Sequence, residues 1–146
     1  MTTNLDSLPY ATRGTVLGVS AVLFFAALLM PAMYFEKEAP LQGLSVLAQG
    51  WLGLLMLNPS WLANPLYVLA AVQFVRKRYA RATLFCGAAI ACALCSLLTS
   101  QWYFSEAAGT PIASLGIAFY AWLAALVVLL LGSLRLRRQS PETSPG

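Results

Sequence analysis

The sequence predicts an all-α integral membrane protein, a single domain over residues 1–146 built as a four-helix bundle with both termini in the cytoplasm. Hydrophobic residues make up 60% of the chain and charged residues 10%, against roughly 45–50% and about 25% in soluble domains. Long uncharged runs recur along the chain. Basic residues stand before the first run, after the second span and after the last span. A further helix, interfacial or re-entrant, is expected between spans 1 and 2.

Residues 14–35 are the first predicted span. The run holds 22 residues without a charge, enough for about 33 Å of helix, which exceeds the roughly 30 Å hydrocarbon core. A cleaved signal peptide is the alternative. The run is longer than the roughly 7–15 residues of a signal core, and no Ala-x-Ala site closes it. A permanent span is therefore favoured.

The topology depends on residues 41–75, which form an uncharged run of 35 residues interrupted by two Asn and two Pro. Two crossings here would place the basic turn at 76–81 outside. One crossing leaves eight of the nine Lys and Arg residues on the cytoplasmic side, as the positive-inside rule requires. We therefore expect a non-spanning helix at 41–57 and the second span at 59–75. A single long, bent helix is the alternative.

The third span is predicted at residues 82–100 and the fourth at residues 112–134. Trp102 and Tyr103 follow the third span and suit the headgroup level. Gly109, Thr110 and Pro111 precede the fourth and suit a helix start. Three arginines between residues 135 and 138 close it on the cytoplasmic side, and residues 139–146 are expected to be a disordered tail.

Several function classes are excluded by composition. The chain has no histidine, which removes bis-imidazole haem, histidine-ligated metals and histidine acid–base catalysis. The predicted spans contain no Asp, Glu, Lys or Arg, whereas proton-coupled transporters usually bury at least one. The basic residues behind the net charge of +4 lie at the span ends, where the positive-inside rule explains them, so no nucleic-acid partner is expected. No metal and no cofactor is expected either, given the lack of histidine.

Cys92 and Cys95 form a C-x-x-C within the third span. Membrane thiol oxidases that pass electrons to quinone carry such a pair near the outer face, and the chain is similar to them in this pair alone. The only other cysteine is Cys86, and no cation flanks the pair. Packing is therefore favoured, because Gly87, Ala91 and Cys95 form a small ridge that lets helices approach closely.

A second small-residue pattern lies in the first span, where Gly14 and Gly18 form a G-x-x-x-G. This motif brings two membrane helices into contact. Packing within the bundle is favoured over a homodimer face.

Polar and aromatic side chains are expected to meet in the outer half of the bundle, because polar atoms in hydrocarbon need partners. The candidate binding or packing residues here are Gln49, Trp51, Trp61, Asn64, Tyr120 and Trp122. A partner such as Asn64 or Gln49 is predicted for Tyr120 and Trp122. A structural hydrogen-bond network is favoured, and a small-molecule or lipid site is the alternative. Asn64 and Pro65 also have a local interpretation, which we favour for this pair: an N-cap followed by proline in the first helical turn.

Glycines, aromatic residues and one Asn-Pro pair carry a resemblance to known proteins. They are Gly50, Trp51, Gly53, Trp61, Ala63, Asn64, Pro65, Gly116, Tyr120 and Trp122. With this set, residues 41–122 resemble small four-helix bacterial inner-membrane proteins of uncharacterised function. The resemblance implies the four-helix architecture and a multi-pass location in the bacterial inner membrane, and it implies no activity.

These observations favour a non-enzymatic membrane protein, an accessory or scaffold subunit that binds another membrane protein or itself within the lipid bilayer. Plentiful small-residue surfaces and the lack of ionisable groups in the spans favour this function. One alternative is a membrane thiol–disulfide oxidoreductase using Cys92 and Cys95, with quinone as its cofactor. A small transporter or an immunity-type protein is the other.

Overall fold

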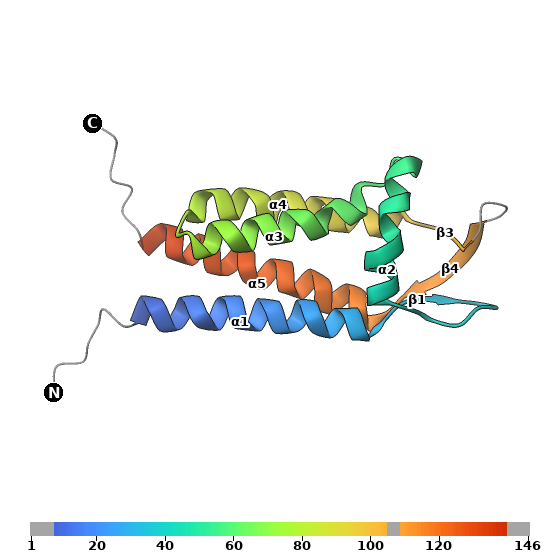
Figure 1. The fold of residues 1–146 in the computed structure, drawn as a ribbon, viewed down its shortest axis with the longest axis horizontal. Coiled ribbons are helices and arrows are strands. Elements are labelled where there is room, and N and C mark those ends of the chain that lie inside the picture. The colour runs from blue at the N-terminus through green and yellow to red at the C-terminus, as the bar shows by residue number, and fades with distance from the viewer. Residues whose placement is uncertain (1–7, 105–108, 140–146) are drawn as a thin grey trace.

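A computed structural model describes residues 8–104 and 109–139 of the chain. It is mostly helical, with four longer helices: α1 (Leu8–Leu29), α3 (Ala63–Val75), α4 (Tyr79–Leu94) and α5 (Ile117–Gln139). These helices lie side by side along the long axis of the molecule, and a small sheet and the short helix α2 lie at one end (Figure 1). The predicted tail at 140–146 lies outside the described residues, and Gln139 is the last residue of α5.

The bundle is held together by close packing of small residues. Helix α1 packs along α5, α5 along α4, and α4 along α3. Ala70 on α3 and Ala82 and Ala89 on α4 are fully buried, and such small side chains let helix backbones approach closely. The ring of Tyr67 on α3 stacks on Phe24 of α1 with centroids 4.5 Å apart, so α1 and α3 also meet.

Three helices in the described part of the chain are long and apolar enough to cross a membrane: Thr12–Leu29, Tyr79–Leu98 and Ile117–Gln139. Their outer faces are apolar as well. Val22, Phe25 and Leu131 are 68%, 64% and 60% exposed. Soluble monomers rarely expose contiguous apolar surface on this scale, so these helices fit a membrane protein.

The first helix ends earlier than predicted, and a strand follows it. Helix α1 stops at Leu29, and β1 occupies Pro31–Phe35, although the first span was expected to continue to residue 35. Pro31 explains the difference, because a proline has no N–H and disfavours helical backbone at the residue before it. Residues 33–35 instead pair with a second strand far along the chain.

That partner strand is β4 (Gly109–Leu115), and the last helix begins at Ile117 rather than at the predicted residue 112. The sheet is antiparallel with the order β2-β1-β4-β3, where β2 is Leu41–Gln42 and β3 is Gln101–Tyr103. The prediction of an all-α fold is therefore wrong in this part. Pro111 is tolerated in β4 because the pairing with β1 ends at Ile112.

Gly116 makes the tight passage from β4 into α5. Its N–H donates a hydrogen bond to the carbonyl of Ala32 at 2.8 Å. A Cβ at this position would overlap the carbonyl oxygen of Pro31, so the two chain segments approach each other only because the residue is glycine. This contact fixes the sheet to the end of the bundle.

A helical segment lies across the sheet end of the bundle, between β2 and α3 (Figure 1). It comprises α2 (Gly43–Gln49) and the 3-10 helix η2 (Gly50–Met56), and we call it the cap segment. It falls within residues 41–57, for which a non-spanning helix was predicted. The 3-10 helix η3 (Pro59–Leu62) then leads directly into α3, and the two are helical over residues 59–75, the predicted second span. Helix α3 itself has 13 residues and is not one of the three helices that are long and apolar enough to cross a membrane.

The third predicted span is also divided. Helix α4 begins at Tyr79 and is followed by the 3-10 helix η4 (Cys95–Leu98). Trp102 and Tyr103, expected at the headgroup level, belong to β3. The bundle end that carries the cap segment and the sheet is thus more elaborate than the sequence predicted.

Candidate functional site

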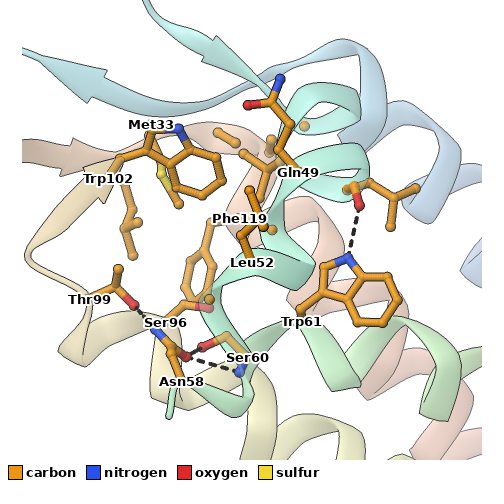
Figure 2. Close-up of a pocket in the computed structure, with 18 of the residues that line it drawn as sticks. Met33, Gln49, Leu52, Asn58, Ser60, Trp61, Ser96, Thr99, Trp102 and Phe119 are labelled. Atoms are coloured by element: carbon orange, nitrogen blue, oxygen red, sulfur yellow. Dashed lines mark hydrogen bonds between the residues drawn. The ribbon is translucent and has the colours of Figure 1, made fainter. Parts of the chain in front are cut away.

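A cavity of about 570 Å³ lies beneath the cap segment, between it, the sheet, the end of α4 and the start of α5 (Figure 2). Its volume is within the roughly 300–1,000 Å³ typical of small-molecule sites. Most of the lining is apolar, and the aromatic residues that line it are Trp61, Trp102, Tyr103, Phe104, Phe119 and Trp122. None of the described residues that line it is Asp, Glu, Lys or Arg.

Four small polar side chains meet at one side of the cavity, which we call the polar corner (Figure 2): Asn58, Ser60, Ser96 and Thr99. Asn58 is the centre of it. Its Nδ2 donates to Thr99 Oγ1 at 2.6 Å, and its Oδ1 accepts from the backbone N–H of Ser60 at 3.0 Å and from Ser60 Oγ. The side chain thus caps η3 and links it to the segment after α4.

Ser96 differs from the other three because its side chain takes part in none of these hydrogen bonds. It is only 9% exposed and lies beside Asn58 and Ser60 (Figure 2). Its hydroxyl forms no hydrogen bond with any residue that the structure describes. The hydroxyl oxygen is not among the sealed side-chain atoms that lack a partner, so an occupant of the cavity can reach it as one donor and acceptor.

Three of the predicted site residues form a connected series at the base of the cap segment. Trp122 Nε1 donates to Asn64 Oδ1 at 3.1 Å, and Asn64 Nδ2 donates to the carbonyl of Trp61 at 3.1 Å. Trp61 Nε1 in turn donates to the carbonyl of Leu47 in α2 at 2.8 Å. The predicted partnership with Asn64 is therefore formed by Trp122. The prediction that Asn64 is an N-cap is wrong, because α3 begins at Ala63, the N-cap position is Leu62, and no side chain caps it.

The other predicted binding residues lie apart from this series. Tyr120 is 60% exposed and does not line the cavity, and its neighbour Phe119 lines it instead. Trp51 is half-exposed and also lies outside the lining. Gln49 lines the cavity, but its amide lies on the side away from the polar corner (Figure 2).

The predicted small-residue ridges face outward. Gly87 and Ala91 are exposed on α4, and a Cβ at Gly87 would meet nothing within 4 Å. The same open space surrounds Gly14 and Gly18 on α1. Packing inside the bundle, the favoured role for both patterns, uses other residues of these helices, among them the fully buried Ser20.

The cysteines are free thiols, with Cys86 buried and Cys92 and Cys95 half-buried. Cys95 Sγ donates a weak hydrogen bond to the carbonyl of Ala91 at 3.5 Å. None of the three lines the cavity. The C-x-x-C pair is therefore not part of the cavity wall.

Sequence reasoning missed Ser96, Phe119 and Trp102 as cavity residues, and no local pattern marks them. It also missed Asn58, for which a local signal existed, because Asn followed by Pro and Ser is a helix N-cap pattern. Trp102 is also notable because its Nε1 is buried without a partner among the described residues.

Over residues 8–104 and 109–139 the fold is mostly helical, with three helices apolar enough to cross a membrane and, beneath the cap segment, a cavity lined by uncharged residues. Comparison of the chain with protein-family models, with curated proteins and with solved structures found no match.

Proposed function

We propose that this chain is a non-enzymatic membrane protein that acts as an accessory or scaffold subunit and binds another membrane protein or a second copy of itself. The observation that carries the proposal is the outward position of its small-residue patterns. Gly14 and Gly18 on α1 and Gly87 on α4 have open space around them. In lipid, small residues strengthen association where a second helix packs on them.

The proposed orientation has both termini in the cytoplasm of a bacterium, with the four helices crossing the inner membrane. Basic residues lie at the bundle end away from the sheet, where α1 begins, α3 turns into α4 and α5 ends (Figure 1). Lys37, Glu36 and Glu38 lie between β1 and β2 at the sheet end. This separation supports the orientation, because cytoplasmic loops carry the excess of Lys and Arg.

Two alternatives have less support. A thiol oxidoreductase would need Cys92 and Cys95 beside an electron acceptor, and neither thiol lines the cavity. A transporter would need a path through the bundle, whose centre is filled by fully buried residues such as Ala70, Leu126 and Leu129. Both observations favour a binding role over chemistry or transport.

The test is the state of assembly in a mild detergent. We expect the wild-type protein to purify as a homo-oligomer or with a partner in fixed stoichiometry, measured by light scattering coupled to size-exclusion chromatography. Gly14→Leu with Gly18→Leu, or Gly87→Leu, should return it to a monomer, because leucine blocks close helix approach. Val68→Leu adds bulk to an exposed position of α3 and should leave the assembly intact.

Two results would contradict the proposal. One is a wild-type protein that is strictly monomeric and has no stoichiometric partner. The other is assembly that persists in all the glycine variants. Cys92→Ser with Cys95→Ser should leave assembly unchanged, and a loss of assembly there would favour a role for the thiol pair instead.

A further inference from the structure

We infer that the cavity beneath the cap segment binds the uncharged head of a membrane amphiphile, a molecule with carbonyl or hydroxyl oxygens on its head and a long apolar chain. The head would contact the polar corner, and the chain would leave the cavity past η2. This site is separate from the outward glycine faces on which the proposed function rests.

The lining determines the charge of the ligand. A charged group placed in apolar surroundings is strongly destabilised unless it is paired, and the described residues that line this cavity supply no charged partner. A phosphate or carboxylate would therefore have to stay outside. An uncharged head can enter, because its oxygens need only hydrogen-bond donors.

The polar corner supplies those donors at a buried position. Asn58 is already engaged with Thr99 and Ser60, which fixes the geometry of the corner. Ser96, nine-tenths buried, keeps its hydroxyl free of bonds to the described residues, and Figure 2 places it within this group. A ligand carbonyl or hydroxyl at this point would pair a group that the protein leaves unpaired.

The rim of the cavity suits the apolar chain. On the cap side, Leu55 and Met56 of η2 line the cavity and are 74% and 64% exposed. On the sheet side, Tyr103 and Phe104 line it and are about half-exposed. A head-first ligand would therefore pass from an apolar rim to a buried polar corner, with its chain kept among apolar side chains.

Two kinds of membrane molecule share this chemistry, an isoprenoid quinone and a glyceride. Decylubiquinone and 1-monoolein serve as probes for them. Oleoyl lysophosphatidylglycerol has the oleoyl chain of monoolein but a charged phosphate. Binding of each to the full-length protein would be measured by native mass spectrometry from detergent micelles and by tryptophan fluorescence, since Trp61, Trp102 and Trp122 line the cavity.

Two variants test the position of the ligand. Gly53 lines the cavity, and a Cβ there would lie in ordinary contact 3.8 Å from Asn58 Cβ, so Gly53→Leu fills the space beside the polar corner. Its control is Ala80→Leu, which adds bulk at an exposed position at the start of α4, the end of that helix away from the cavity. Ser96→Val removes the free hydroxyl, and Ser114→Val, exposed in β4 and outside the lining, is the matched control.

We expect one neutral probe to bind with a stoichiometry of one, and the phosphate probe to bind at least tenfold more weakly. Gly53→Leu should abolish binding, and Ser96→Val should raise the Kd about fivefold, the value of one net hydrogen bond.

Binding of decylubiquinone alone assigns a quinone head, and binding of monoolein alone a glyceride head. The inference is overturned if neither neutral probe binds, if the phosphate probe binds equally well, or if binding survives in Gly53→Leu. Assembly is measured separately, so its loss would not affect this result.

Discussion

The indole Nε1 of Trp122 lies 3.1 Å from Oδ1 of Asn64 and donates a hydrogen bond from α5 to the start of α3. Asn64 continues the connection to the carbonyl of Trp61, whose own indole holds α2 through Leu47. The cap segment is thus connected to the bundle by directional bonds as well as by apolar contact. The position of the cap over the cavity depends on these residues.

Trp122→Phe tests this connection. It removes the donor, keeps an aromatic ring and leaves Asn64 Oδ1 without its partner, so the free energy of unfolding should fall by about 1 kcal/mol. Thermal unfolding in detergent would measure the change. Tyr120→Phe, at an exposed neighbouring position, is the control and should have no effect. Equal destabilisation by both variants would show that the hydrogen bond is unimportant.

A buried pair between α1 and α3 gives a prediction of rank order. Ser20 Oγ donates to the carbonyl of Ala125 at 2.8 Å and lies 2.9 Å from the hydroxyl of Tyr67, which must therefore donate to Ser20. Ser20→Ala leaves that hydroxyl buried without a partner, at a cost of about 1–3 kcal/mol. Tyr67→Phe removes the hydroxyl and keeps the stacking on Phe24, so it should cost less.

The double variant completes the test. In Ser20→Ala with Tyr67→Phe no orphaned hydroxyl remains, so it should be no less stable than Ser20→Ala alone. Unfolding midpoints of the four proteins in one detergent would be compared. Additive losses from the two substitutions would contradict the assigned hydrogen bond.

The helices were predictable because length and absence of charge are local properties of the sequence. The strands were not, because β1 is held by residues about 80 positions away, as in the pairing of Tyr34 with Ser114. A short uncharged segment at the end of a helix has the same pattern whether it is helical or extended. Pro31 was the available signal that the helix ends before it.

The site was predictable only in part, for the same reason. Asn64 and Trp122 drew attention because polar atoms within apolar segments need partners. Ser96 and Phe119 look like ordinary residues of an apolar helix, and they border a cavity only because the cap segment folds over the end of the bundle. That fold depends on long-range contacts, so no local pattern marks these two residues.

Gly132 gives a third prediction, on the packing of α1 against α5. A Cβ at Gly132 would overlap the side chain of Val16, so Gly132→Val should force the helices apart and cost about 1–3 kcal/mol. Val16→Ala removes the methyl groups that a Cβ at Gly132 would meet, so Gly132→Val should cost less in a Val16→Ala background than in the wild type. The loss of unfolding free energy caused by Gly132→Val is measured in both backgrounds, so the difference between the two isolates packing. Equal effects would contradict the close approach.

The last prediction concerns the orientation of the chain. Glu38 in the loop before β2 and Arg78 in the turn before α4 are both exposed. In the proposed orientation, with the basic residues cytoplasmic, position 38 would face the periplasm and position 78 the cytoplasm. Glu38→Cys and Arg78→Cys would be made separately in a background carrying Cys86→Ala, Cys92→Ser and Cys95→Ser. A membrane-impermeant maleimide should label position 38 in intact cells and position 78 only after permeabilisation. Labelling of position 78 in intact cells would place the basic turn outside and overturn both the topology and the single crossing assigned to residues 41–75.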